Sequence, residues 1–140
     1  MYFDKFRFLT EPGLLREVAK AVAALLPPGV TMLGAPEGAA MLLVAAVALE
    51  TGLPVAVVRK QPKEYGTKAQ VEGIVEPGGR VALIEDVSTT GQQLQRAAET
   101  LERAGAEIAA IVLAIDRGGA DHLRESGYVV EAVAMLRPDP

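Results

Sequence analysis

The sequence predicts an α/β fold: a single domain over 1–140 with a mostly parallel sheet and helices on both faces. Three observations lead to this prediction. Short apolar segments alternate along the chain with longer segments whose apolar residues recur at helical spacing. The short segments are apolar throughout, which is typical of strands buried on both faces. Finally, 140 residues, half of them hydrophobic, suit one domain with a single core.

The first half of the chain is expected to contain two helices and two strands. Pro12 suits the first turn of a helix, and Pro27 would end that helix because proline cannot continue it. Gly52 is placed to stop a second, strongly apolar helix. Phe6 and Phe8 are spaced as in a strand. The expected elements are, in order, a helix over 12–26, a strand over 30–33, a tight turn over 34–38, a helix over 39–51 and a strand over 55–58.

A long polar segment follows. Residues 59–72 are charged and turn-prone, and so long a loop inside a compact domain is usually functional. Beyond it, strands and helices alternate again, and Gly105 is placed to end the helix that precedes it. The expected elements are a turn over 76–79, a strand over 81–84, a helix over 92–104, a strand over 108–115, a loop over 116–119, a short helix and a strand over 128–135.

Composition and charge exclude several classes of protein. A net charge of −4 disfavours a general nucleic-acid binder, so any anion site must be built locally. No apolar run is long enough to span a bilayer, and the first residues, MYFDKFRFLT, lack the apolar core of a signal peptide. The absence of cysteine excludes disulfides and thiolate chemistry. We therefore expect a cytoplasmic protein that binds neither nucleic acid nor membrane.

The stretch VALIEDVSTTGQQL, residues 81–94, contains the first candidate site. A strand would bring Glu85 and Asp86 to the carboxyl edge of the sheet, beside a turn of hydroxyls and glycine that opens a helix. Hydroxyl donors, backbone N–H groups and the helix dipole form a cradle for a phosphate. The acids could accept hydrogen bonds from sugar hydroxyls or attract Mg²⁺. Alternatively, the turn is only a helix N-cap and the acids are solvated.

The long loop contains the second candidate site. Arg59, Lys60, Lys63 and Lys68 concentrate positive charge in an otherwise acidic chain. Several cations on a mobile segment could close over a polyanion and exclude water from it. The alternative is an ordinary solvated basic loop.

Taken together, these stretches resemble two signatures of the type I phosphoribosyltransferases. The segment VALIEDVSTTGQQ is similar to the motif that binds phosphoribosyl pyrophosphate (PRPP), and RKQPKEYGTK followed by VEG is similar to the catalytic loop of orotate phosphoribosyltransferases. Weaker similarities extend over nearly the whole chain. They lie at Tyr2-Phe3-Asp4, at the expected pyrophosphate loop over 34–38 and at Ile115-Asp116-Arg117.

The resemblance implies a reaction and a set of roles. Orotate phosphoribosyltransferases transfer ribose 5-phosphate from PRPP to N1 of orotate, release pyrophosphate and use Mg²⁺. Lys60 and Lys63 would contact pyrophosphate, with Lys63 the main group that stabilises the leaving group. Glu85 and Asp86 would bind the ribose hydroxyls and stabilise the developing cation. Further PRPP contacts are implied for Arg59, Tyr65, Ser88, Thr89, Thr90, Gly91, Gln92 and Gln93, and a contact with the orotate carboxylate for Arg117. No residue is assigned as a direct metal ligand, because Mg²⁺ would arrive with PRPP. The resemblance also implies a homodimer, because the family's loop reaches the neighbouring subunit's site.

The chain departs from the family's pattern in four ways. It lacks a hood segment before Tyr2 and a final helix, Glu37 lies where some members carry lysine, and Gln92-Gln93 replaces smaller residues. A carboxylate beside pyrophosphate is unfavourable unless it points away or helps to bind metal. Two alternatives to orotate transfer therefore stay open: a PRPP- or nucleotide-binding regulatory protein on the same fold, and a phosphoribosyltransferase for another base.

Overall fold

The computed structural model describes residues 4–61 and 70–136. In chain order the elements are α1 (Phe6–Thr10), α2 (Pro12–Ala24), β1 (Met32–Pro36), α3 (Ala40–Thr51), β2 (Val55–Val58), β3 (Val71–Glu72), β4 (Arg80–Ser88), α4 (Gln92–Arg103), β5 (Glu107–Asp116), α5 (Gly119–Glu125) and β6 (Val130–Met135). None of the helices in these two ranges combines the length and apolar character needed to cross a membrane.

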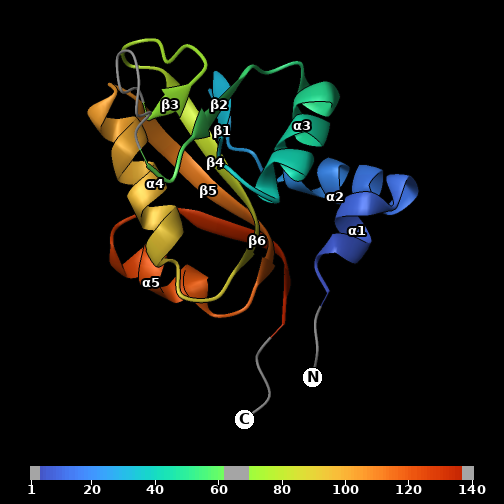
Figure 1. Ribbon diagram of the computed structural model, residues 1–140. Coiled ribbons are helices and arrows are strands. Elements are labelled where there is room, and N and C mark those ends of the chain that lie inside the picture. The colour runs from blue at the N-terminus through green and yellow to red at the C-terminus, as the bar shows by residue number, and fades with distance from the viewer. Residues whose placement is uncertain (1–3, 62–69, 137–140) are drawn as a thin grey trace.

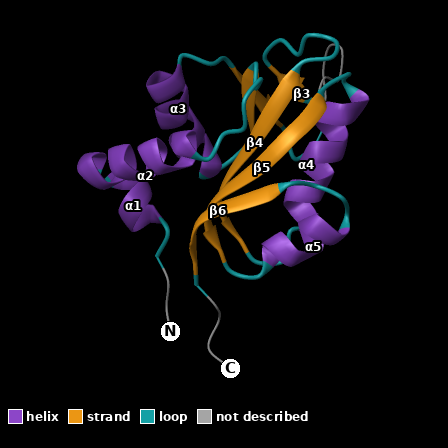
Figure 2. Cartoon of the chain, turned by 180° about the vertical axis from the view of Figure 1, so that it is seen from behind, coloured by secondary structure: helices purple, strands orange, loops and turns teal. Residues whose placement is uncertain are grey.

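The strands form one sheet in the order β3-β2-β1-β4-β5-β6. All neighbouring pairs are parallel except β2 and β3, which are antiparallel. Helices α1, α2 and α3 cover one face of the sheet and α4 and α5 cover the other (Figures 1 and 2). The predicted mostly parallel sheet with helices on both faces is therefore confirmed.

The tight turn expected over 34–38 is wrong for its first three residues. Gly34, Ala35 and Pro36 belong to β1, which lies between β2 and β4 at the centre of the sheet. A Cβ on Gly34 would lie 3.1 Å from side-chain carbons of Leu101 and Val81, so glycine lets α4 pack closely on the strand. The Gly-Ala-Pro composition suggested a turn, whereas close packing from distant parts of the chain makes this segment a buried strand.

The strand spacing of Phe6 and Phe8 was also misleading, because both residues lie in helix α1. Asp4 supports the start of that helix by accepting a hydrogen bond from the backbone N–H of Phe6 at 3.0 Å. Phe8 enters the core, whereas Phe6 is half exposed. Two residues spaced by two cannot distinguish a strand from one turn of helix.

Strand β4 is longer than the expected strand over 81–84. It continues to Ser88, and its last residues pair with β5 at Val87↔Ile115 and Ser88↔Asp116. Polar side chains at 85, 86 and 88 hid this extension, because the prediction relied on continuous apolar character. Glu85 and Asp86 consequently lie within a paired strand rather than just beyond its end.

The loop expected over 59–72 is wrong for its last two residues. Val71 and Glu72 form β3, which pairs antiparallel with β2 at Val57↔Glu72 and Val58↔Val71.

Candidate active site

The carboxyl ends of four parallel strands, β2, β1, β4 and β5, open at the same edge of the sheet, where ligands bind in folds of this type. There the structure brings together residues that are far apart in the sequence. A hollow of about 120 Å³ at this edge is lined by Lys5, Pro36, Glu37, Gly38, Ala39, Ala40, Lys60, Glu85, Asp86, Val87 and Gln93. The predicted acids, Lys60 and Gln93 thus share one hollow.

A second hollow, of about 160 Å³, adjoins the first and shares Pro36, Lys60 and Gln93 with it. It extends over α4, and its remaining lining residues are Val58, Arg59, Gln70, Arg96, Ala97 and Thr100. Arg96 was not a candidate from the sequence. Arg96 lies on α4 beyond the hydroxyl-rich turn, so neither of the two motifs contains it.

The two acids on β4, Glu85 and Asp86, lie in different environments. Asp86 is 2% exposed, and its Oδ2 lies 3.4 Å from Lys5 Nζ. The backbone N–H of Asp86 donates to Oε1 of Glu85 at 3.1 Å. Burial raises the pKa of Glu85 from its ordinary 4.5 to about 9, and the hydrogen bond and charge of Asp86 add to the rise.

The pKa of Asp86 moves the other way. Burial on its own would raise it, but hydrogen bonds from the Glu85 side chain and the Val87 backbone, with the charge of Lys5, hold the pKa of Asp86 below its ordinary value. The two shifts together favour a proton on Glu85 and a negative charge on Asp86.

The turn between β4 and α4 leads into α4, which is longer than α5, the other helix on the same face of the sheet. Thr89 and Thr90 are exposed, and Gly91 adopts a φ of 81° that favours glycine. Thr90 Oγ1 accepts from the backbone N–H of Gln92 at 3.3 Å, a local turn contact just before the helix. The N-cap residue itself is Gly91, which has no side chain to cap α4. The exposed hydroxyls lie at the positive end of the α4 dipole, so the turn can also hold a phosphate.

Ser88 and Gly119 join this turn to the start of α5. Ser88 is buried, and a Cβ on Gly119 would collide with Ser88 Oγ and lie 3.0 Å from the backbone nitrogen of Gly91. Ser88 was expected to contact PRPP. In this structure its side chain packs against Gly119, and the contact holds the turn against the neighbouring loop. The PRPP contact of Ser88 stays a prediction.

Arg117 directly follows β5, as expected. Its backbone N–H donates to the carbonyl oxygen of Ser88 at 2.8 Å, which places it beside the β4–α4 turn. Asp116 shapes the loop after it, because its Oδ1 accepts from the N–H groups of Gly118 and Ala120 at 2.8 and 3.2 Å. The structure thus brings the orotate candidate close to the phosphate candidates.

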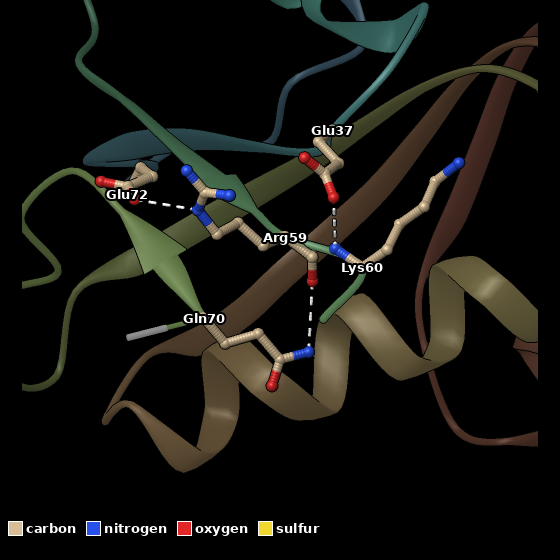
Figure 3. A network of polar contacts seen from close by, with 5 residues as sticks. All are labelled: Glu37, Arg59, Lys60, Gln70 and Glu72. Atoms are coloured by element: carbon tan, nitrogen blue, oxygen red, sulfur yellow. Dashed lines mark hydrogen bonds and ion pairs between the residues drawn. The ribbon is translucent and has the colours of Figure 1, made fainter. Parts of the chain in front are cut away.

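Both ends of the long basic loop are held by polar contacts (Figure 3). Arg59 and Gln70 bond twice, from Arg59 N to Gln70 O at 2.7 Å and from Gln70 Nε2 to Arg59 O at 3.2 Å. The Arg59 side chain pairs with Glu72 at 3.0 Å. Glu37 Oε1 accepts from the backbone N–H of Lys60 at 2.8 Å. Glu37 is therefore used to hold the start of the loop, and the Lys60 side chain extends away from that of Arg59 (Figure 3).

The predicted residues Lys63, Tyr65 and Lys68 lie outside the described residues, as do Tyr2 and Phe3 of the Tyr2-Phe3-Asp4 segment. The main addition from the structure is Lys5. It precedes α1, about eighty residues before Asp86 in the sequence, and no spacing pattern linked it to the acid pair.

Comparison with known proteins agrees with this geometry. The family model for the phosphoribosyl transferase domain matches residues 10–134. The chain belongs to the phosphoribosyltransferase family. This phosphoribosyltransferase is 42% identical over 132 residues to the orotate phosphoribosyltransferase of Thermococcus gammatolerans, covering 91% of the chain and 70% of the relative. It is 45% identical over 134 residues to the orotate phosphoribosyltransferase of a Nocardioides species, covering 94% of the chain and 75% of the relative.

Solved structures of this family share the fold. Orotate phosphoribosyltransferase from Aeropyrum pernix has a TM-score of 0.84 at 26% identity, over 96% of this phosphoribosyltransferase and 78% of that chain. UMP synthase from Leishmania donovani has a TM-score of 0.82 at 33% identity, over 96% of this chain and 30% of the longer one. The resemblance inferred from the two sequence signatures is therefore confirmed.

Proposed function

We propose that this phosphoribosyltransferase transfers ribose 5-phosphate from PRPP to N1 of orotate, a step of pyrimidine nucleotide biosynthesis. The observation that carries the proposal is the meeting of an acid pair, a hydroxyl-rich helix start and Lys60 at one sheet edge. The choice of orotate as the acceptor base rests on the relatives named orotate phosphoribosyltransferase. A cytoplasmic location is part of the proposal.

In the proposed reaction, N1 of orotate forms a bond to C1′ of the ribose while the bond from C1′ to the pyrophosphate oxygen breaks. Pyrophosphate leaves with the electron pair, and the ribose passes through an oxocarbenium-like state. Asp86 is buried, its pKa is held below its ordinary value and it lines the hollow at the sheet edge, so it would stabilise that cation electrostatically. Lys60, with Lys63 from the loop, would stabilise the departing pyrophosphate, and Arg117 would pair with the orotate carboxylate.

Mg²⁺ would enter with the pyrophosphate of PRPP and neutralise part of its charge. Within residues 4–61 and 70–136, no group of three or more His, Asp or Glu side chains could hold a metal ion without such help. In proteins, Mg²⁺ is commonly bound through substrate phosphates and only one or two carboxylates. Exposed Thr89, Thr90, Gln92 and Gln93 would hold the 5′-phosphate at the start of α4.

The proposal is tested by following the absorbance of orotate with purified protein, PRPP and Mg²⁺, with parallel reactions that offer uracil, adenine, guanine or hypoxanthine. We expect orotate alone to be consumed, and Lys63→Ala to lower turnover far more than PRPP affinity, because Lys63 would act on the leaving group. If another base were consumed and orotate were not, that base would be the substrate in place of orotate. PRPP binding without consumption of any base would favour the regulatory alternative.

We further propose that the enzyme is a homodimer. The family's loop closes on the neighbouring subunit, and α3 leaves apolar side chains exposed at Met41, Leu42 and Leu49, the last of them 90% exposed. A hollow of about 330 Å³ between α2 and α3 borders the same surface and is lined partly by Leu15 and Leu49. Sedimentation equilibrium is expected to give twice the mass of the chain, and Leu49→Glu to shift it toward the monomer. A monomer at micromolar concentration would contradict this proposal.

A further inference from the structure

Lys5 approaches the acid pair from outside both sequence motifs. Its Nζ lies 3.4 Å from Asp86 Oδ2, and the lysine side chain is 40% exposed, whereas the aspartate is 2% exposed. The same Nζ lies 5.8 Å from the centre of the Phe6 ring. Oδ2 of Asp86 is buried, and the ammonium group of Lys5 is the cation beside it. The Glu85 side chain and the Val87 backbone also stabilise the charged carboxylate, and Lys5 adds its positive charge to theirs.

This pair differs from an ordinary surface ion pair. Exposed pairs contribute little because water screens both charges. Here one partner is almost fully buried, and a buried carboxylate that loses its counter-charge becomes unfavourable in its ionised form. The position of Lys5 therefore bears directly on the charge state of Asp86.

The balance of charges around the hollow also depends on Lys5. Lys5 and Lys60 are its cations, and Glu37, Glu85 and Asp86 are its acids. With the proton on Glu85, two positive charges face two negative charges. Without Lys5 the lining would be net negative, which opposes entry of a pyrophosphate. Glu37, at the position where some members of the family carry lysine, adds a negative charge that Lys5 balances.

We propose that Lys5 is a positioning residue of the PRPP pocket: its ammonium group holds the Asp86 carboxylate charged and oriented toward the ribose, and balances the acids around the pyrophosphate. The inference rests on the proposed function, because it assigns Lys5 to the same site. It adds to the two family motifs a residue from the segment before α1, which neither motif contains.

The test compares Lys5→Met, Lys5→Gln and Lys5→Arg with Lys20→Met, a control on the exposed side of α2. Binding of PRPP with Mg²⁺ is measured by calorimetry, and KM and kcat are measured where turnover occurs. Lys5→Met and Lys5→Gln are expected to weaken PRPP binding about 10-fold or more, with KM for orotate nearly unchanged. Lys5→Arg should recover most of the affinity, because it restores the positive charge. Lys20→Met should match the unmodified chain.

Equal PRPP affinity in Lys5→Met and Lys20→Met would overturn the inference. So would loss of affinity in Lys5→Arg equal to that in Lys5→Met, because a positive charge at residue 5 would then not matter. The inference and the proposed function can fail separately. If the unmodified chain binds PRPP but consumes no orotate, the base assignment fails while calorimetry still tests Lys5. If it does not bind PRPP, both fail.

Discussion

Replacing Asp86 with asparagine is expected to lower kcat/KM for transfer to orotate about 10²–10³-fold, the range found when one preorganised electrostatic group is removed from an active site. The substituted side chain would keep the shape of the aspartate but lose the negative charge that faces the developing ribose cation. Because Asp86 is buried and Lys5 holds its charged form, little water is available to replace that charge. Initial rates at saturating orotate and varied PRPP measure the effect.

The matched control for this substitution is Asp121→Asn. Asp121 lies on α5, is largely exposed and is 3.8 Å from Arg124, outside both hollows at the sheet edge. It should retain nearly full activity, because an exposed pair of this kind contributes little. If Asp86→Asn kept more than a third of the unmodified kcat/KM, the electrostatic role of Asp86 would be wrong.

Replacing Glu85 with glutamine is expected to stabilise the fold at alkaline pH while it impairs catalysis. The pKa of Glu85 is raised from 4.5 to about 9 in the folded state, so between these values the folded chain binds more protons than the unfolded chain. The free energy of unfolding therefore falls as pH rises from about 5 to 9. Glutamine cannot ionise, and its amide can still donate a hydrogen bond to Asp86, so the variant escapes this loss.

The measurement is thermal unfolding of both proteins at pH 5, 7 and 9. We expect the two melting temperatures to be close at pH 5 and the variant to be more stable at pH 9 by up to about 5 kcal/mol, because each pH unit over which only the folded chain holds the proton contributes about 1.4 kcal/mol. Asp86 does not interfere in this window, because its lowered pKa makes its contribution change only below its ordinary value. A difference in melting temperature that stays constant from pH 5 to 9 would show that Glu85 is not protonated in the folded state.

Much of the fold could be predicted because its signals are local. The helix beginning at Pro12, the stop at Gly52 and the strand over 55–58 were each indicated by residues within the element or next to it. The long polar segment was likewise visible as an interruption between regular elements. The order of elements then determined which strand ends could meet, because parallel strands open at the same edge.

Errors arose where local composition and tertiary packing disagree. Gly34 and Pro36 suggest a turn, yet β2 and β4 pair with that segment on both sides and make it a strand. Glu85 and Asp86 interrupt the apolar pattern of β4, yet pairing with β5 continues past them to Ser88. Hydrogen bonds from a neighbouring strand do not depend on whether a side chain is polar, so the apolar pattern underestimates such strands.

The sequence by itself determined the α/β class, the order of most elements from Pro12 onward, the two motifs and the family to which they point, since each of these depends on residues that are close together in the chain. It missed α1 and β3. Only the tertiary structure decided the environment of each polar group. It placed Lys5 against Asp86, Ser88 against Gly119 and the Glu37 carboxylate on the backbone of Lys60. It also decided which carboxyl group of the acid pair holds the proton, because burial and nearby charge come from segments that only folding brings together.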